Sequence, residues 1–237
     1  MASPPECVVE DLGRLAYAPA LALQRARHAD AVARRGDGPG CTLLLVEHDP
    51  PVVTLTRRAG VRDHLLVSEA ALAQAGIELH ETDRGGDITY HGPGQLVAYP
   101  IVDLQRAGLG IHAYIRALEE AIIRTCADFG VACHREEGAT GVWTGGPGAS
   151  ARKIAAIGVR VSRWVTMHGL ALNVDPRLEH FATIVPCGLA GRPVTSLAQE
   201  RGGRAPALAE VKKALAQRLQ EALGEASASA AARLTRP

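Results

Sequence analysis

The amino-acid sequence predicts an α+β fold in which a mixed β-sheet is flanked by helices. The segments that look like strands outnumber those that look like helices, and several of them follow one another directly, which argues against a doubly wound alternation of strands and helices. The chain has 237 residues, of which 47% are hydrophobic, enough to build one large domain with a real core. We expect a single domain over residues 1–224, with at most a small C-terminal subdomain at 192–224, and a disordered tail at 225–237.

The expected helices are marked by spacing and by end signals. Apolar residues recur at helical spacing over residues 110–129, between two glycines, and this is the clearest amphipathic helix. Residues 18–35 are rich in alanine and arginine, and residues 206–224 repeat leucine and valine at helical intervals. Ser68 can cap a short helix that closes at Gly76.

The expected strands are short apolar runs bounded by glycine, proline or charge. The runs 153–162 and 164–174 follow each other with almost no linker, so they predict a hairpin that turns near Arg163. The runs are residues 42–47, 52–57, 77–82, 95–103, 131–134, 141–144, 153–162 and 164–174.

One stretch is hard to explain as ordinary scaffold: Arg84 to Gln95 reads Arg-Gly-Gly-Asp-Ile-Thr-Tyr-His-Gly-Pro-Gly-Gln. Glycine has no Cβ, so its backbone can lie directly against a bound molecule or adopt a positive φ. Strands avoid such a density of glycine because each one weakens the ladder. We expect a loop, a short strand at 88–91 and a tight turn that together hold a ligand; a glycine-rich surface hairpin is the alternative.

Composition excludes several classes of function. A net charge of +1 and 3% aromatic residues do not favour nucleic-acid binding. The N-terminus lacks the features of a secretory signal, and no apolar run approaches the roughly 20 residues that span a bilayer, so we expect a cytoplasmic protein without membrane segments. The histidines are scattered without His-Glu-x-x-His spacing, so no metal site is expected. Five cysteines without Cys-x-x-Cys spacing fit neither a disulfide framework nor a zinc finger.

Two residues stand out as candidates for chemistry. Cys187 lies between Pro186 and Gly188, in a turn that would project the thiol and leave backbone N–H groups free nearby. Lys153 opens an apolar run after a glycine-rich loop, and an inward-facing amine would lose hydration and become a candidate base. An inert, capped thiol and a solvated lysine are the alternatives. Packing better explains three other cysteines, Cys41, Cys126 and Cys133, and Cys7 has no obvious neighbour in the sequence.

Four motifs, in this order, resemble the octanoyltransferases of lipoate biosynthesis, the lipoate-protein ligase B family. They are the glycine-rich stretch 84–95, Lys-Ile-Ala-Ala-Ile-Gly-Val at 153–159, His-Gly-Leu-Ala-Leu-Asn-Val at 168–174, and Pro-Cys-Gly at 186–188. The similar region covers roughly residues 46–197, and four ordered motifs are far more specific than one glycine-rich string. The resemblance implies the fold of the biotin- and lipoate-protein ligase catalytic domains. It assigns nothing to the variable loop at 144–152.

The resemblance also implies a reaction. Cys187 and Lys153 would form a catalytic pair that moves an octanoyl group from octanoyl-acyl carrier protein to a lysine, through an acyl-thioester on Cys187. The implied acceptors are the lipoyl domains of 2-oxoacid dehydrogenase E2 subunits and the glycine cleavage H protein. No cofactor is implied, since thioester exchange is nearly isoenergetic and the final amide is more stable. The implied lining of the acyl tunnel is Arg84, Gly85, Gly86, Asp87, Ile88, Thr89, Tyr90, His91, Ala156, Ile157, Gly158, Gly169, Leu170 and Ala171.

Further roles in this reaction are expected for groups around the pair. Backbone N–H groups near Gly188, with His91, are candidate oxyanion donors. Because carrier and lipoyl domains are generally acidic, arginines at the rim are candidate docking residues: Arg57, Arg58, Arg62, Arg152 and Arg160.

Two other functions remain open. An ATP-dependent lipoate- or biotin-protein ligase would share the architecture but activate a carboxylate as an adenylate, without need of Cys187. A non-catalytic acyl- or lipoyl-binding module would bind the acyl chain without turnover. Acylation of Cys187 in the absence of nucleotide separates the transferase from both.

Overall fold

The computed structural model describes residues 7–34, 37–38, 40–186 and 191–234. A seven-stranded sheet runs in the order β1-β2-β6-β10-β9-β8-β7, and a three-stranded sheet runs β4-β3-β5. Strands β1/β2 and β3/β4 pair in parallel, and the other neighbours are antiparallel, so the predicted mixed sheet is confirmed. The strands are β1 Cys7–Leu15, β2 Cys41–His48, β3 Val52–Leu55, β4 Glu78–Glu81, β5 Ile88–His91, β6 Gln95–Val102, β7 Cys133–Glu136, β8 Ala139–Thr144, β9 Arg152–Ser162 and β10 Val165–Asn173.

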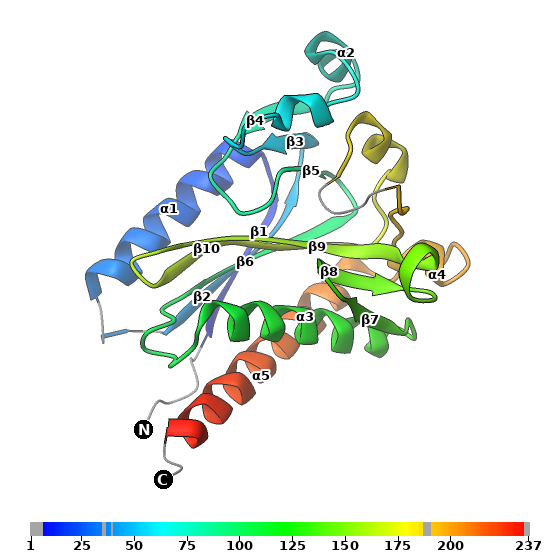
Figure 1. The fold of residues 1–237 in the computed structure, drawn as a ribbon. Coiled ribbons are helices and arrows are strands. Elements are labelled where there is room, and N and C mark those ends of the chain that lie inside the picture. Colours follow the sequence, from blue (N-terminus) through cyan, green and yellow to red (C-terminus); the bar gives the residue numbers. More distant parts are fainter. Residues whose placement is uncertain (1–6, 35–36, 39, 187–190, 235–237) are drawn as a thin grey trace.

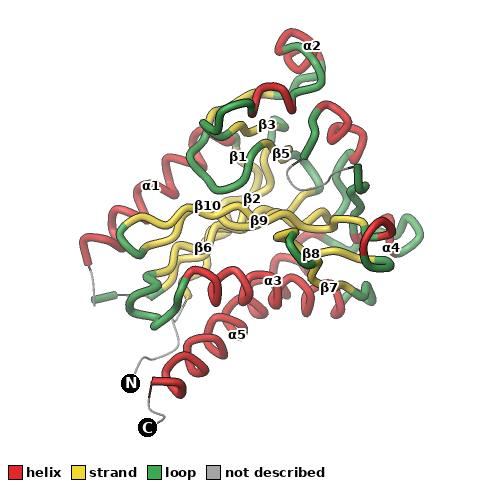
Figure 2. The backbone as a smooth tube through the Cα atoms, viewed as in Figure 1, coloured by secondary structure: helices red, strands yellow, loops and turns green. Residues whose placement is uncertain are grey.

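Helices cover both faces of the large sheet, as Figure 1 shows. Helix α1 (Tyr17–Arg34) and the small sheet lie on one face, and α3 (Ile111–Asp128) and α5 (Leu208–Leu234) lie on the other. The short helices α2 (Glu69–Gln74) and α4 (Leu197–Glu200) sit at the periphery (Figure 2). None of the helices in the described ranges is both long and apolar enough to cross a membrane.

The largest hydrophobic cluster lies between the large sheet and the pair α3 and α5. Leu118 and Ile122 of α3 meet Leu215 and Leu219 of α5 there, and all four side chains are fully buried. The apolar stripe that predicted α3 is therefore the stripe that faces the sheet. Helix α5 shares this core and does not build a core of its own.

The predicted hairpin is formed by β9 and β10. Ser162 pairs with Val165, and the two turn residues, Arg163 and Trp164, have φ of 51° and 63°. Positive φ at both central positions is what a two-residue type I′ turn requires, and this turn matches the twist of the strands that it joins.

The structure corrects the expectation that no cysteines are paired. Cys7 and Cys41 form a disulfide. They are direct partners in the parallel pair β1 and β2, with Cα atoms 4.4 Å apart. Strand β1 was not expected from the sequence, so nothing in the spacing of the cysteines pointed to this contact.

Helix α5 also extends ten residues beyond its expected end at Gly224 and includes residues 225–234, which we had expected to be disordered. Ser227 Oγ donates to the carbonyl of Ala107 at 2.6 Å, and Glu225 forms an ion pair with Arg124 of α3 at 2.7 Å. These contacts with distant parts of the chain hold a segment whose own composition is small and polar. Residues 235–237 lie outside the described ranges.

Candidate active site

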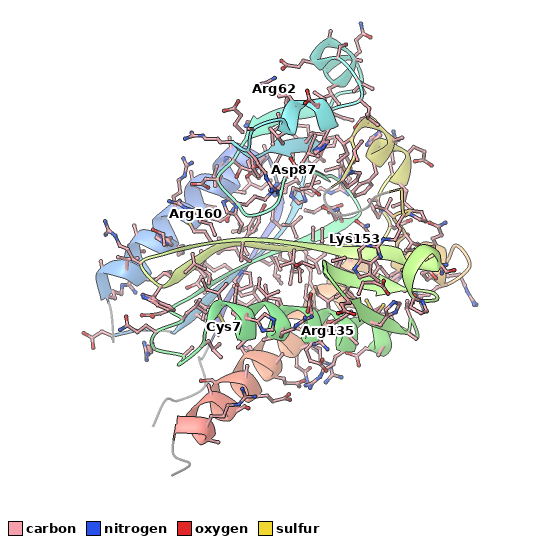
Figure 3. The ribbon with its side chains drawn as sticks, in the orientation of Figure 1. Cys7, Arg62, Asp87, Arg135, Lys153 and Arg160 are labelled. Atoms are coloured by element: carbon pink, nitrogen blue, oxygen red, sulfur yellow. A yellow bond between two sulfur atoms is a disulfide. The ribbon has the colours of Figure 1, made fainter. Side chains whose placement is uncertain are left out.

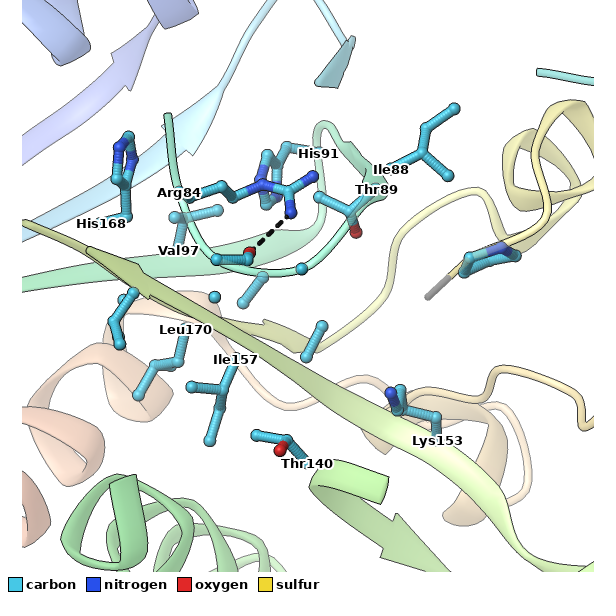
Figure 4. Close-up of a pocket in the computed structure, with 18 of the residues that line it drawn as sticks. Arg84, Ile88, Thr89, His91, Val97, Thr140, Lys153, Ile157, His168 and Leu170 are labelled. Atoms are coloured by element: carbon cyan, nitrogen blue, oxygen red, sulfur yellow. Dashed lines mark hydrogen bonds between the residues drawn. The ribbon is translucent and has the colours of Figure 1, made fainter. Parts of the chain in front are cut away.

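A pocket of about 390 Å³ lies where the glycine-rich segment crosses the hairpin of β9 and β10 (Figure 4). Lys153, His168 and Pro186, from three separate segments, share this pocket. The predicted tunnel residues that line it are Arg84, Gly85, Gly86, Ile88, Thr89, His91, Ala156, Ile157, Gly158, Gly169, Leu170 and Ala171. Figure 4 places Arg84, His91 and His168 on one side of the hairpin and Ile157, Leu170 and Thr140 on the other.

Two of the residues expected in the tunnel face elsewhere. Side chains alternate along β5, so Tyr90 points away from His91, packs against Phe181 and hydrogen-bonds His180 Nδ1 at 2.8 Å. Asp87 turns toward His64, whose Nδ1 lies 2.6 Å from its carboxylate. Both residues support the walls of the pocket from behind.

Three glycines let backbone segments meet closely at the centre of the pocket. A Cβ on Gly85 would lie 2.9 Å from the carbonyl oxygen of Val159, and one on Gly158 would lie 2.8 Å from that of Gly85. A Cβ on Gly169 would clash with the carbonyl oxygen of Ala98. Any side chain at these three positions would force the segments apart.

Lys153 is turned inward, as the functional interpretation of the sequence required. It is 7% exposed, and its Nζ lies 4.7 Å from the ring centroid of the fully buried Trp143. The indole is fixed by a hydrogen bond from its Nε1 to Ala139 O, and its ring also carries the guanidinium of Arg192 at 4.0 Å. The electron-rich face of the ring attracts the ammonium and holds it at one end of the pocket.

The backbone of Lys153 is held from the other side by the residues that follow the Pro-Cys-Gly motif. Its N–H donates to Pro193 O and its carbonyl accepts from Thr195 N, both at 2.9 Å. This short parallel contact draws residues 193–195, which we had considered as the start of a subdomain, into the wall of the pocket. Cys187 and Gly188 lie outside the described residues. The residue before them, Pro186, lines the pocket.

His91 is held as a neutral side chain in the pocket wall. Its Nδ1 lies 2.7 Å from Gln95 Oε1, and the Gln95 amide donates to Asn173 Oδ1 at 2.9 Å. The acceptor Oε1 requires a proton on Nδ1 of His91, which leaves Nε2 as an acceptor. Burial, followed by the nearby His48, lowers the pKa of His91 to about 3. A neutral imidazole without a proton on Nε2 cannot donate to an oxyanion from that nitrogen, which does not favour the oxyanion role expected for His91.

Two further buried histidines lie nearby, His168 in the wall of the pocket and His48 behind it. His48 Nδ1 lies 3.0 Å from Leu15 O, its Nε2 lies 2.7 Å from the Tyr99 hydroxyl, and burial lowers its pKa to about 4. His168, with φ of 57°, contacts Asp83 through Nε2 at 3.0 Å, and burial lowers its pKa as well. The pocket therefore contains hydrogen-bonded but neutral imidazoles beside its apolar wall.

Most of the expected rim arginines form ion pairs with carboxylates of the protein itself. Arg62 pairs with Glu69, Arg152 with Glu200 and Arg160 with Asp83 (Figure 3 labels Arg62 and Arg160). Arg57 and Arg58 are exposed directly after β3 and form no ion pair with a described residue. Among the five candidates, these two have charges that remain available to an acidic partner. The described residues hold no cluster of His, Cys, Asp or Glu that could bind a metal ion.

Sequence reasoning missed several pocket residues. Gln95, His168 and Asn173 stand at the ends of the recognised motifs, and buried polar side chains at motif ends were a usable signal. Val159 also closes the motif at 153–159. The lining residues outside the four motifs are brought in by tertiary packing: Tyr17, Val97, Tyr99, Ile115, Gly138, Ala139, Thr140, Phe181 and Val194.

Comparison with known proteins shows the family to which the chain belongs. Residues 16–220 match the model of the lipoyl protein ligase A/B catalytic domain, and the chain belongs to this family. Within it, the chain is an octanoyltransferase family member. It is 47% identical over 218 residues to the octanoyltransferase of Geobacter metallireducens, covering 92% of this chain and 94% of that one, and 54% identical over 202 residues to that of Acidobacterium capsulatum, covering 80% and 78%.

Solved structures show the same fold at low identity. A lipoate protein ligase from Thermoplasma acidophilum superposes with a TM-score of 0.66 at 17% identity, covering 98% of this chain and 92% of that one. A biotin protein ligase from Aquifex aeolicus, solved with biotin and ATP, gives 0.52 at 11% identity, covering 92% and 70%. The predicted fold class is thereby confirmed.

Proposed function

We propose that this chain transfers an octanoyl group from octanoyl-acyl carrier protein to a lysine of lipoyl domains, through an acyl-thioester on Cys187. The observation that carries the proposal is the convergence of inward-facing Lys153 and of Pro186, which directly precedes Cys187, on one pocket walled by glycine and apolar side chains. Membership of the octanoyltransferase family supports the acyl group. The acceptors would be E2 lipoyl domains and the glycine cleavage H protein.

In the first half of the reaction, the Cys187 thiolate attacks the thioester carbonyl of the donor. The carbon–sulfur bond to the carrier breaks, and the carrier thiolate leaves with a proton. Lys153 accepts the Cys187 proton and returns it to this leaving group. The octanoyl group then rests on Cys187 while the two carrier proteins exchange.

In the second half, the amine of the acceptor lysine attacks the Cys187 thioester. The carbon–sulfur bond breaks, an amide forms, and Lys153 moves the surplus proton from the attacking amine to the Cys187 thiolate. No bond to a nucleotide forms at any step, so the cycle runs without ATP. The ring of Trp143 fixes the amine that serves both halves.

The groove fits an alkyl chain because its apolar walls bind a ligand by removing its CH₂ groups from water. Each CH₂ removed from water contributes about 0.8 kcal/mol, so an eight-carbon chain gains several kcal/mol without any polar contact. Glycines 85, 158 and 169 keep the walls close. A pocket that ends in packed side chains would select the length of the chain.

Mass spectrometry of the purified chain with octanoyl-acyl carrier protein tests the proposal. We expect one octanoyl group on Cys187 in the absence of nucleotide, its loss on addition of a lipoyl domain, and no adduct in Cys187→Ala. Lys153→Met should slow both steps, whereas a non-catalytic binding module would be indifferent to it. An adduct that needs ATP, or one that persists in Cys187→Ala, would contradict the proposal and favour the ligase.

A further inference from the structure

A short antiparallel ladder stands at the border of the pocket. Leu66 N–H donates to Thr183 O and Val185 N–H donates to His64 O, both at 2.8 Å. We call the two paired segments, 64–66 and 183–185, the entrance ladder. Val185 is followed directly by Pro186, which lines the pocket. The surface of this ladder is therefore adjacent, along the chain, to the pocket itself.

One face of the entrance ladder is buried and the other is exposed. Leu65 and Ile184 are paired at its centre, so their side chains share one face, and both belong to the hydrophobic cluster of the small sheet. Side chains alternate along a strand, so Leu66 and Val185 share the opposite face, where they are 58% and 38% exposed. They are diagonal neighbours across the ladder, within reach of each other. Apolar side chains that are exposed together, and not singly, favour a contact surface.

Positive charge lies next to this exposed face. Asp87, labelled in Figure 3, joins the two parts: its carbonyl accepts from Thr56 N–H at 3.1 Å, and its carboxylate lies 2.6 Å from Nδ1 of His64 in the ladder. Arg57 follows Thr56 directly and is thereby held close to the ladder, with Arg58 after it. Both arginines are exposed and form no ion pair with a described residue. A cationic rim therefore borders the apolar pair.

The other charges of this loop do not cancel the rim. Arg62 is already paired with Glu69 and Glu81. Residues 56–66 hold three arginines against one aspartate, Asp63, in a chain whose net charge is only +1. An acidic partner complements such a surface, and a basic partner would be repelled by it.

The distance between the entrance ladder and the nucleophile favours the acceptor over the donor. Two residues of chain span at most about 7 Å, so Val185 and Cys187 are close neighbours. The acceptor amine ends a lysine side chain about 6 Å long, so the acceptor domain must approach within that distance of the thioester. The donor thioester ends the long, flexible pantetheine arm of its carrier, which can dock farther away. A surface beside Cys187 therefore suits the acceptor.

We propose that Leu66 and Val185, with Arg57 and Arg58 at their border, form the docking surface for an acidic acceptor domain that presents the lysine to be octanoylated. This inference rests on the proposed function, which makes a lysine of a lipoyl domain the acceptor. The apolar pair packs against the domain beside its lysine, and the arginines attract its carboxylates and speed the encounter. The surface takes no part in the chemistry and brings the amine to the thioester.

Separating the two halves of the reaction tests the proposal. Cys187 is first octanoylated with S-octanoyl-pantetheine, which has no carrier body, and the acyl-enzyme is then mixed with the lipoyl domain of an E2 subunit. Mass spectrometry follows both steps. We expect Leu66→Ser to lower the second-order rate constant of transfer about tenfold, the effect of partly burying one leucine. Acylation by the small donor should be unchanged, which also shows that the variant is folded.

Trp164→Ser is the matched control for the apolar pair. Trp164 is 51% exposed but lies in the hairpin turn, about 30 Å along β9 from Lys153, so its loss should leave the transfer rate unchanged.

Charge reversal tests the cationic rim. We expect Arg58→Glu to lower the rate of transfer to the lipoyl domain about tenfold at low salt, and the difference should shrink as salt is added. Arg233→Glu is the control with the same change of net charge, because Arg233 is exposed in the last turn of α5, on the other face of the large sheet (Figure 1).

The outcomes separate this inference from the proposed function. Equal transfer rates in Leu66→Ser, Arg58→Glu and the unmodified protein would overturn the inference and leave the proposed function intact. Variants that slow acylation by octanoyl-acyl carrier protein, but not transfer to the lipoyl domain, would also overturn it, because the surface would then receive the donor. Absence of octanoylation of Cys187 in the unmodified protein would overturn the proposed function itself.

Discussion

Buried histidines around the pocket make the stability of the protein sensitive to acid. His48 and His91 are buried, hydrogen-bonded and neutral, with pKa values lowered by burial to about 4 and about 3. An unfolded histidine titrates near 6.5, so the unfolded chain binds more protons than the folded chain between pH 6.5 and these lower values. The free energy of unfolding is therefore complete above pH 6.5 and falls as the pH falls below it.

The size of this loss follows from the shifts. Each bound proton changes the free energy of unfolding by about 1.4 kcal/mol per pH unit. Between pH 7.5 and 5, each histidine then removes about 2 kcal/mol, and the two together about 4 kcal/mol, a large share of the 5–15 kcal/mol of a typical domain. His168, whose pKa is lowered in the same direction, adds to the loss.

Equilibrium urea unfolding at a series of pH values measures this effect. His48→Gln keeps an acceptor for Tyr99 but cannot titrate, so its loss between pH 7.5 and 5 should be smaller than that of the unmodified protein by about 2 kcal/mol. His112→Gln is the matched control, because His112 is exposed at the start of α3. A flat dependence on pH in the unmodified protein, or the same slope in His48→Gln, would refute the reasoning.

Three more perturbations probe the pocket and the fold. Gly158→Val places side-chain atoms against the carbonyl of Gly85 and should weaken octanoate binding at least tenfold by calorimetry, while Gly110→Ala, in open space, should not; equal binding would show that the groove lies elsewhere. Gln95→Leu leaves Asn173 and His91 without their partner and should lower the free energy of urea unfolding by about 1–3 kcal/mol, and Gln95→Glu, which buries a carboxylate against the acceptor Asn173 Oδ1, should cost at least as much; no loss in Gln95→Leu would deny the network its role. Cys7→Ser opens a loop with a sequence separation of 34 and should destabilise the oxidised protein by about 4 kcal/mol in thermal unfolding, with no difference under reductant; a difference that survives reduction would point to packing instead.

The local elements were predictable where sequence pattern and tertiary contact agree. The apolar stripe of α3 faces the core, the hairpin turns at Arg163 and Trp164, and the strand 88–91 has the bounds that its flanking glycines set. Strand β1 was not predicted because it forms by pairing with strand β2, 34 residues away, and few of its side chains are buried. The last turns of α5 were missed for a similar reason, since Ser227 and Glu225 are held by partners far away in the sequence.

The residues of the candidate site also fall into two groups, those predicted from sequence motifs and those revealed only by tertiary contacts. Motif residues such as Lys153, Gly158 and Gly169 line the pocket as expected, because the family resemblance had fixed them. The role of Trp143 was beyond sequence reasoning. A cation over a ring arises only when β8 and β9 bring Trp143 and Lys153 together in space.

The guanidinium of Arg84 also affects the entropic cost of binding a ligand in this groove. Arg84 donates to Thr54 O at 3.0 Å, to Asp87 O at 3.1 Å and to Gly85 O at 3.0 Å. One side chain therefore fixes the backbone of the glycine-rich segment through hydrogen bonds to carbonyl oxygens. A glycine-rich loop without these hydrogen bonds would be ordered only when the ligand binds, and the conformational entropy lost in that step would weaken the binding. Here the backbone loses this conformational entropy when the protein folds, so an alkyl chain that binds meets a groove whose backbone is already ordered.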